Sequence, residues 1–304
     1  MKQGFVKVAS ATPRIRVADP VYNAQVICEQ AKEAAEHGAK IVVFPELCIT
    51  GYTCNDLFLQ ELLLEKAKEA LLTIAEETGQ LETLFLVGLP VDKDGRLYNV
   101  AAVLYRGRIL GMIPKKNIPM YAEFYEGRHF TPGEETVTEY RLGKQVIPFG
   151  SNLLFRCEEL PELILGCELC EDLWVAEPPS TSHALMGATV IANLSASNET
   201  VSKDDYRTLL IKASSARLLC GYIYTSAGEG ESTQDLVFGG HDLIAENGTL
   251  LVQSARFTTG ILYTDLDVLK ISSERRRMGT FGKRPMKPYL TVPFSMRSEE
   301  HTSE

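Results

Sequence analysis

The chain has 304 residues, of which 45% are hydrophobic and 23% are charged, so it can bury the core of one large domain or of two small ones. Its formal net charge of −9 and its pI near 5.3 argue against nucleic acid as the main partner, because phosphate binding needs clustered Lys and Arg. The sequence has no run of about 18 apolar residues, the length that a membrane span requires, and no signal-peptide core near its first residue.

The first third of the chain alternates between strand-like and helix-like segments. Phe5–Ala9 is expected to form a short strand. Asp19 and Pro20 then supply an N-cap and a proline in the first helical turn, and they predict a helix that continues until His37 and Gly38. Three further elements follow from their apolar patterns: a buried strand at Lys40–Phe44, an amphipathic helix at about residues 58–77, and a buried strand at Thr83–Leu89.

The rest of the chain adds hairpins to this alternation. Val100–Ile113 predicts two strands joined at Arg106-Gly107, and His241–Leu251 predicts a second hairpin around Asn247-Gly248. Helical stretches, most clearly Asp204–Cys220, separate the strands that we expect at Leu163–Cys167, Thr189–Leu194 and Tyr222–Ser226. Together these units indicate an α/β protein with mixed sheet covered by helices in layers.

Residues 269–296 change character, because basic residues crowd together there with prolines and few apolar anchors. The basic residues are Arg275, Arg276, Arg277, Lys283, Arg284 and Lys287. A solvated linker is the preferred interpretation, and a basic arm that docks on an acidic neighbour is the alternative. Residues 297–304 (RSEEHTSE) match what a common sequencing-adaptor DNA encodes in frame, so we expect a non-native tail and a natural protein that continues past about Met296.

The seven cysteines are odd in number and lack the spacing of a disulfide scaffold. They are Cys28, Cys48, Cys54, Cys157, Cys167, Cys170 and Cys220. Free thiols in a reducing compartment fit this pattern, so a cytoplasmic protein is expected. Most of the thiols are expected to be inert and buried, which leaves room for one reactive cysteine.

Two segments place a charged side chain at the end of a predicted buried strand, where sites form in open α/β sheets. Glu46 follows the apolar run in VFPEL, where poor solvation would raise its pKa and suit it to act as a base. Lys115 lies in a stretch rich in proline and aromatic residues, from Ile113 to Tyr125, where a lysine can stabilise an oxyanion. Taken alone, each is better explained as an ordinary solvated charge.

A third segment, LGCELCEDLW, leads a strand into a turn that carries Cys167 and Cys170 beside acidic residues. A zinc site would need a second pair of ligands, and no matching CxxC or HxxxH follows. A redox disulfide of the thioredoxin type normally opens a helix without adjacent carboxylates, which would disfavour the thiolate. A nucleophilic Cys170, activated by a base and a cation from elsewhere in the chain, explains the segment better.

Glu46, Lys115 and Cys170 lie in FPE, PK and a C-E-D turn, in this order, and so resemble the triad of the carbon–nitrogen hydrolase (nitrilase) superfamily. The resemblance covers roughly residues 4–266 and is closest to the glutaminase domains of glutamine-dependent NAD synthetases. Their segments look like PKKNIPMYAEFYEGRHF, CELCEDLWVAEPPS, NLSASNE and SAGEGESTQDLVFGGHDLIAENG. The resemblance implies an α-β-β-α sandwich, usually paired across subunits as a homo-oligomer, with residues 1–268 as the hydrolase domain and Glu126 as a supporting glutamate.

The resemblance also implies a substrate and residues that bind it. Tyr121, Ser197 and Lys203 would bind the amino-acid end of L-glutamine, with Glu171 and Tyr52 nearby. Lys203 stands where some relatives are expected to have arginine, which would replace a bidentate carboxylate contact by a single point charge. Ordinary loop polarity would also explain Ser197 and Lys203 without a binding role.

By the same resemblance, the chain would release ammonia from glutamine through a cysteine thioester, without a metal or organic cofactor, for a synthetase domain that uses ATP and Mg. No glycine-rich SGG-type loop of such a domain occurs in the sequence, so residues 269–296 are expected to lead towards a missing domain. Two other interpretations stay open: a free-standing amidase that acts on another small amide, and a catalytically silent module for dimerisation.

Overall fold

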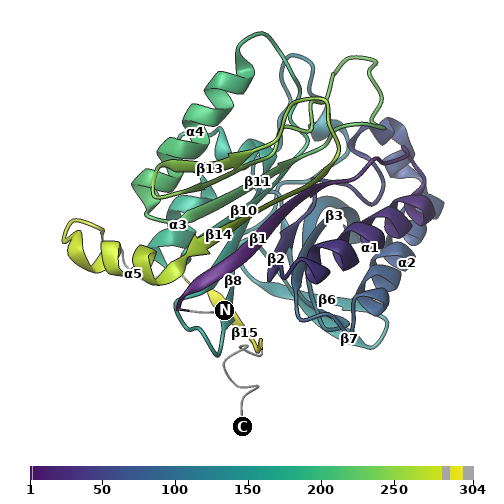
Figure 1. The fold of residues 1–304 in the computed structure, drawn as a ribbon. Coiled ribbons are helices and arrows are strands. Elements are labelled where there is room, and N and C mark those ends of the chain that lie inside the picture. Colours follow the sequence, from purple (N-terminus) through teal and green to yellow (C-terminus); the bar gives the residue numbers. More distant parts are fainter. Residues whose placement is uncertain (2, 283–287, 297–304) are drawn as a thin grey trace.

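The computed structural model describes residues 1, 3–282 and 288–296, in which two mixed β-sheets pack face to face and helices cover both outer faces (Figure 1). Within these residues the first sheet has eight strands in the order β14-β1-β2-β3-β4-β5-β7-β6. The second sheet has seven described strands in the order β13-β12-β11-β10-β9-β8-β15. The layers confirm the expected α-β-β-α sandwich of the α/β class.

The strands follow the chain from one sheet into the other. The first sheet contains β1 (Phe5–Thr12), β2 (Ile41–Val43), β3 (Leu84–Lys93), β4 (Arg96–Tyr105), β5 (Arg108–Pro114), β6 (Thr138–Leu142), β7 (Gln145–Phe149) and β14 (Gly260–Asp267). The second contains β8 (Leu153–Cys157), β9 (Ile164–Leu169), β10 (Val190–Ser195), β11 (Gly221–Ser226), β12 (Leu243–Glu246), β13 (Thr249–Gln253) and β15 (Leu290–Phe294).

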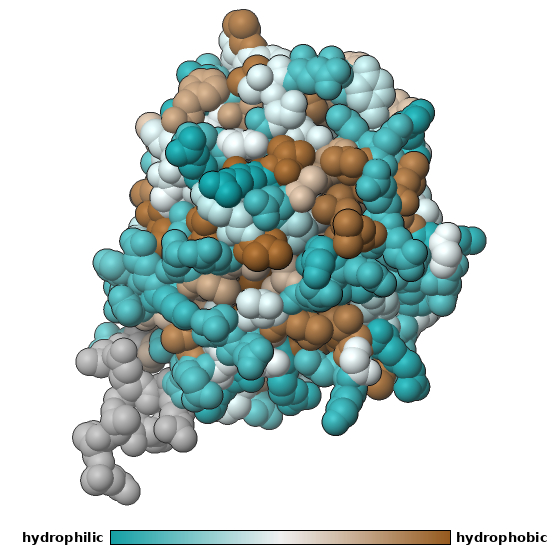
Figure 2. Space-filling model, turned by 90° about the vertical axis from the view of Figure 1, so that its right-hand side faces the viewer, coloured by the Kyte–Doolittle hydropathy of each residue, from teal (hydrophilic) through white to brown (hydrophobic). Residues whose placement is uncertain are grey.

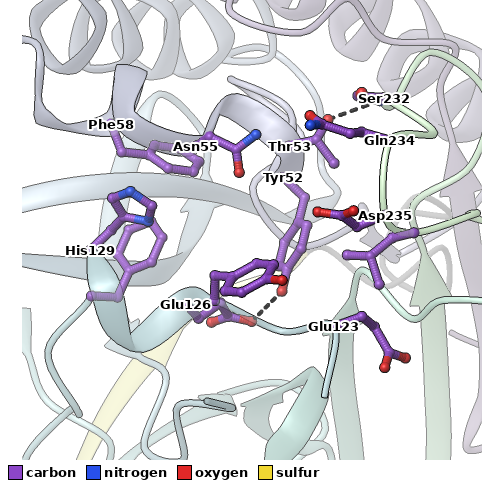
Figure 3. Close-up of a pocket in the computed structure, with 13 residues that line it drawn as sticks. Tyr52, Thr53, Asn55, Phe58, Glu123, Glu126, His129, Ser232, Gln234 and Asp235 are labelled. Carbon is purple, nitrogen blue, oxygen red and sulfur yellow. Dashed lines mark hydrogen bonds between the residues drawn. The ribbon is translucent and has the colours of Figure 1, made fainter. Parts of the chain in front are cut away.

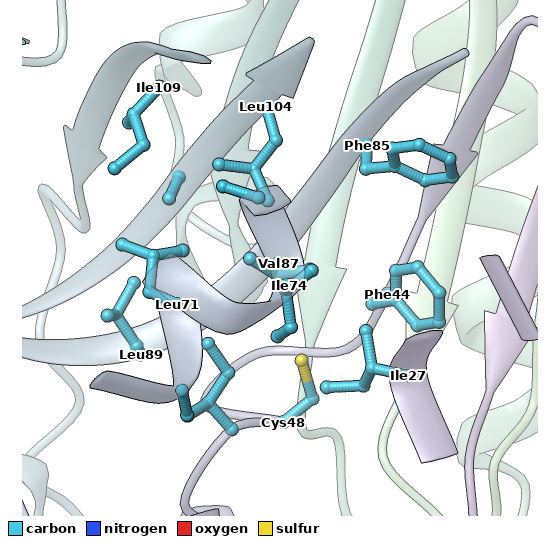
Figure 4. Packing of buried hydrophobic residues seen from close by; sticks show 14 of the residues in the cluster. Ile27, Phe44, Cys48, Leu71, Ile74, Phe85, Val87, Leu89, Leu104 and Ile109 are labelled. Atoms are coloured by element: carbon cyan, nitrogen blue, oxygen red, sulfur yellow. The ribbon is translucent and has the colours of Figure 1, made fainter. Parts of the chain in front are cut away.

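Apolar faces hold the layers together. Helices α1 (Pro20–Glu36) and α2 (Glu61–Glu77) pack on the outer face of the first sheet, where Ile27, Leu71 and Ile74 meet strand residues such as Phe85 and Val87 (Figure 4). Helices α3 (Pro179–Leu185) and α4 (Lys203–Leu218) cover the second sheet. A separate cluster fills the space between the sheets, with Val8, Ile41 and Leu86 from one sheet and Leu165, Ala192 and Ile223 from the other.

Local sequence signals set the first helix as expected. The Asp19 side chain accepts a hydrogen bond from Tyr22 N at 3.1 Å, and Pro20 occupies the first helical turn. His37 caps the other end, and Gly38 follows with φ +82°, a conformation that favours glycine. The helix predicted from residue 58 begins instead at Glu61, because Tyr52–Leu59 form a separate 3-10 segment, η1.

The structure corrects the expected solvated linker in the described part of residues 269–296. Val268–Arg277 form helix α5, which buries Val268 and Ile271, and β15 pairs in parallel with β8. Arg275 anchors α5 through hydrogen bonds to backbone carbonyls at the ends of α3 and α4; the acceptors are Ala184, Gly187, Ala188, Leu218 and Leu219. These are helix C-termini, which favour a cation. Lys283, Arg284, Lys287 and residues 297–304 lie outside the described residues.

Strand direction determines where side chains can gather. Strands β1, β2 and β3 run parallel, and β5 runs the same way as β3 because both are antiparallel to β4. In the second sheet, β9, β10 and β11 are parallel to one another. Loops that follow these strands therefore emerge at the carboxyl ends of parallel strands, where ligands bind in open α/β sheets.

The surface seen in Figure 2 shows small hydrophobic areas separated by hydrophilic side chains. Single exposed apolar residues such as Leu62 and Leu72 of α2 are normal on a folded protein. No helix in the part of the chain that the structure describes is long and apolar enough to cross a bilayer.

Candidate active site

Three loops that follow parallel strands carry the reactive side chains predicted from the sequence. Glu46 lies three residues after β2, Lys115 directly follows β5, and Cys170 directly follows β9. The side chains of Glu46 and Lys115 are completely buried, and Cys170 is 7% exposed. The position of each residue after a buried strand is as expected.

Glu46, Lys115 and Glu126 form a buried network of charged hydrogen bonds. Lys115 Nζ donates to Glu46 Oε1 at 2.7 Å and to Glu126 Oε1 at 2.6 Å. Asn99 Nδ2, from the middle of β4, donates to Glu46 Oε1 at 2.7 Å, and the Tyr52 hydroxyl donates to Glu126 Oε1 at 2.8 Å. A completely buried charge without a partner has a large free-energy cost. Each of the three charged side chains therefore depends on the others as hydrogen-bond partners.

Burial and the charges of neighbouring groups together set the acid–base properties of this network. Burial raises the pKa of Glu46 to about 7; the charge of Lys115 opposes this rise, and the charge of Glu126 adds to it. For Lys115, burial acts to lower the pKa, but the charges of Glu126 and Glu46 outweigh it and hold the pKa well above its usual range. Lys115 therefore stays protonated near neutral pH, whereas Glu46 can exchange a proton there.

Both sheets hold the backbone around Glu46. Leu47 has φ +52°, and Gly88 of β3 lies so close that a Cβ there would come within 2.2 Å of Leu47 N. Position 88 therefore requires glycine. From the second sheet, Ala196 N donates to Glu46 Oε2 at 2.9 Å, and Glu46 N donates to the carbonyl of Ser195 at 3.2 Å. Glu46 thus joins the two sheets.

Cys170 begins a tight 3-10 turn, η3 (Cys170–Leu173), with φ +39°. A left-handed backbone is uncommon for a residue with a Cβ, and strain of this kind clusters at functional sites. Burial raises the pKa of Cys170 to about 12; the charge of Glu46 adds to this rise, and that of Lys115 opposes it. The resting thiol is therefore protonated, and it needs a base to become a nucleophile.

A cavity of about 380 Å³ opens over Cys170, within the range of about 300–1,000 Å³ that is typical of small-molecule sites. Four of the five residues predicted to bind substrate line it: Tyr121, Glu171, Ser197 and Lys203. The fifth, Tyr52, is buried against Glu126 and lines a different cavity.

The cavity over Cys170 carries charges of both signs. The Tyr121 hydroxyl lies 3.0 Å from both carboxylate oxygens of Glu171, and burial raises the pKa of that carboxyl. Lys203 Nζ donates to Asn198 Oδ1 and lies 5.2 Å from the centre of the Trp174 ring, and burial lowers its pKa. An acidic and a basic group in one cavity suit a small molecule that bears both an amine and a carboxylate.

Two buried residues of the site were not predicted from the sequence. Asn99 bonds Glu46, and Arg207 of α4 donates to Ser197 Oγ at 3.3 Å and to the carbonyl of Asn198 at 3.2 Å. Asn99 is the polar residue inside the apolar strand LYNVAAVL, and a polar side chain in such a strand indicates a buried hydrogen-bonding role. Arg207 lies on a polar helix, and no local pattern marks it as buried.

A second, smaller cavity of about 50 Å³ is lined by Glu126, which accepts a hydrogen bond from Lys115 (Figure 3). Its walls come from η1, from the short 3-10 turn η2 (Glu126–Arg128) and from the loop at residues 232–236. Figure 3 shows the Tyr52 hydroxyl directed at the Glu126 carboxylate. Glu123 lines both cavities. Among residues with described positions, no group of three or more His, Cys, Asp or Glu side chains could hold a metal ion.

Relatives of this chain share its sequence over part of their length. Glutamine-dependent NAD(+) synthetase of Mycobacterium tuberculosis is 43% identical over 282 residues, which are 92% of this chain and 42% of that protein. The enzyme of the same name from Thermotoga maritima is 32% identical over 296 residues, or 94% of this chain and 47% of that protein. The chain therefore spans less than half the length of these relatives.

Solved structures and a family model agree on the fold. A glutamine-dependent NAD(+) synthetase from Cytophaga hutchinsonii matches with a TM-score of 0.78 and 28% identity, over 86% of this chain and 43% of that one. An amidase from Nesterenkonia sp. shares the fold at 20% identity with a TM-score of 0.69, over 92% of this chain and 97% of that one. The sequence model of the carbon-nitrogen hydrolase family matches residues 7–276. This chain belongs to the carbon-nitrogen hydrolase family.

Proposed function

We propose that the chain is a glutaminase module, which hydrolyses the side-chain amide of L-glutamine through a thioester on Cys170. The observation that carries the proposal is the buried network of Glu46, Lys115 and Glu126, whose charges act on the thiol of Cys170. A base with a pKa near neutrality, a permanent cation and a thiol are the groups that amide hydrolysis by a cysteine requires.

In the proposed mechanism Glu46 takes the proton of Cys170 as the sulfur attacks the amide carbon. Lys115 and the backbone N–H after Cys170 stabilise the oxyanion. The carbon–nitrogen bond then breaks, the proton held by Glu46 passes to the departing nitrogen, and ammonia leaves. Glu46 next removes a proton from water, the resulting hydroxide attacks the thioester, and Cys170 regains its proton as glutamate forms. Each step uses only water, glutamine and groups of this chain.

The charges of the cavity over Cys170 favour an amino-acid amide over a simple amide. Lys203 supplies a cation for the α-carboxylate, and Glu171 supplies an anion for the α-ammonium group. Tyr121 orients Glu171 through its hydroxyl, and Ser197 offers a further hydroxyl. Tyr52 supports Glu126 from outside this cavity.

The ammonia would serve NAD synthesis, as the names of the relatives suggest. In this proposal the acceptor is a synthetase domain that uses ATP with Mg, joined beyond the hydrolase domain and α5, and the modules assemble as a homo-oligomer in the cytoplasm. The alternative function is that of a free-standing amidase that acts on another small amide. The amidase from Nesterenkonia sp. has this fold over 97% of its own chain.

The test uses an electrophilic glutamine analogue and mass spectrometry, together with glutamate release. We expect one label per chain on the peptide that carries Cys170, protection from labelling by glutamine, and glutamate formation that short aliphatic amides do not match. Labelling at Cys167, or faster hydrolysis of short amides than of glutamine, would contradict the proposal.

A further inference from the structure

Asp172 lies between the two loops that carry Lys115 and Cys170, and the proposed mechanism does not use it. It is 1% exposed and belongs to η3, the turn that begins at Cys170. Its carboxylate accepts hydrogen bonds from backbone groups of both loops.

One carboxylate oxygen of Asp172 bridges the two loops. Oδ2 accepts from Leu169 N, directly before the nucleophile, at 3.1 Å, and from Lys116 N, directly after the catalytic lysine, at 3.4 Å. Oδ1 accepts from Asn117 N at 2.8 Å and from Asn117 Nδ2 at 2.7 Å. All four partners are N–H donors, so the site matches a carboxylate, which offers only acceptors.

We infer that Asp172 is a positioning residue, which holds the Cys170 turn and the Lys115 loop in register for the reaction. Cys170 has a left-handed backbone, and such strain persists only when surrounding contacts enforce it. The strands β5 and β9 that deliver the two loops belong to different sheets, so the loops need a direct tie to keep a fixed separation. Asp172 does not line the cavity over Cys170, so its effect on the reaction would pass through Cys170 and Lys115.

The substitution Asp172→Asn tests this inference, which rests on the proposed glutaminase function. An amide has one acceptor oxygen, and its NH2 group would face N–H donors on the other side. If the amide oxygen takes the Oδ1 position, the variant loses the hydrogen bonds from Leu169 N and Lys116 N. If the oxygen takes the Oδ2 position, the variant loses both hydrogen bonds from Asn117. Either orientation weakens the tie.

We expect the kcat for glutamine to fall roughly 100-fold, the scale of a misplacement near 1 Å, while KM changes by less than about threefold. Turnover is expressed per Cys170 labelled to completion by the glutamine analogue, so that loss of folded protein does not count as loss of kcat. Asn117→Ala removes one of the four donors and should lower kcat by roughly threefold to tenfold, the scale of one hydrogen bond. Glu246→Gln is the control, because Glu246 is a buried carboxylate that accepts from Asp267 N, away from the site.

A second measurement does not depend on glutamine. Lys115 lowers the pKa of the Cys170 thiol, whereas Glu46 and Glu126 raise it, so a Cys170 turn that shifts relative to the Lys115 loop should change the rate of alkylation by iodoacetamide at pH 7 by about tenfold, the effect of one pKa unit. Unchanged alkylation, or turnover per labelled site within threefold of wild type, overturns the role of Asp172. If the wild-type chain fails to hydrolyse glutamine, the proposed function is wrong, and alkylation still decides the role of Asp172. If Asp172→Asn does not fold, Asn117→Ala decides, and no effect on either measurement overturns the inference.

Discussion

Replacing Lys115 by methionine should destabilise the protein in a way that depends on pH. Lys115 Nζ lies 2.7 Å from Glu46 Oε1 and 2.6 Å from Glu126 Oε1, so the two oxygens are at most about 5.3 Å apart. Methionine fills a similar volume but carries no charge. The variant therefore leaves two buried carboxyl groups close together without the cation between them.

The size of the effect follows from this separation. Two unit charges about 5 Å apart repel by roughly 3 kcal/mol at an effective dielectric constant of about 20. Removing one partner from a buried pair typically costs about 3–5 kcal/mol, in agreement with this value. Because the unfolding entropy grows with chain length, 1 kcal/mol corresponds to roughly 1.6 °C for a chain of 304 residues, so the midpoint of thermal unfolding should fall by about 5 °C near pH 8.

The pH dependence has a definite sign. Burial already raises the folded-state pKa of Glu46 to about 7, and Lys115 is the main group that opposes the rise. Without Lys115 the pKa of Glu46 rises further. A folded-state pKa above the unfolded value contributes stability that is complete at low pH and is lost as pH rises through the folded-state pKa. The deficit of Lys115→Met relative to wild type should therefore be smaller at pH 5 than at pH 8.

Thermal unfolding between pH 5 and pH 8.5 measures this deficit, and the adjacent residue provides the control. Lys116 has a side chain that is 37% exposed and pairs with Glu135 at 2.5 Å. Lys116→Met should change stability by about 0.5 kcal/mol or less at every pH, as is usual for exposed ion pairs. A deficit for Lys115→Met that equals that of Lys116→Met, or that shrinks as pH rises, would refute the reasoning.

Three further predictions concern activity. Cys170→Ala should abolish glutamine hydrolysis with little change in the unfolding midpoint, whereas Cys167→Ala should keep most of the activity; equal losses would point to a paired-cysteine mechanism. The kcat/KM for glutamine should rise about tenfold per pH unit up to about pH 7, because Glu46 must be ionised to accept the proton of Cys170, and a flat profile from pH 5 to 7 would exclude Glu46 as the base. Glutamate release should be low in this chain and roughly 5–150-fold higher in a longer protein loaded with ATP and the NAD precursor, because this is the usual range of coupling between sites. If this chain releases glutamate as fast as the loaded protein, it is an autonomous hydrolase.

Local patterns were sufficient to predict the elements that deliver the reactive side chains. The apolar run before Glu46 and the strand that ends at Leu169 are buried on both faces, so their composition alone marks them. Asp19 and Gly38 likewise limit α1 through contacts within a few residues. Helix α5 escaped prediction because Arg275, which anchors it, bonds carbonyls 56 or more residues away in the sequence.

The same distinction applies within the candidate site. Glu46, Lys115 and Cys170 could be predicted because each follows a strand. The hydrogen bond between Tyr52 and Glu126 could not, because it depends on how η1 packs against a loop 74 residues later in the chain. Asn99 reaches Glu46 across 53 residues. Such contacts follow from the packing of whole layers, and the sequence near each residue does not contain them.

Arg275 gives the last described helix a mechanical connection to the cavity over Cys170. Helix α4 has 16 residues, so it is a stiff rod about 24 Å long. One end of this rod begins at Lys203 in the cavity, and the carbonyls at its other end bind the guanidinium of Arg275. A pull on the polypeptide beyond α5 would therefore act on the far end of the same rod that carries Lys203, and a shift of that end would tilt the lysine relative to Cys170.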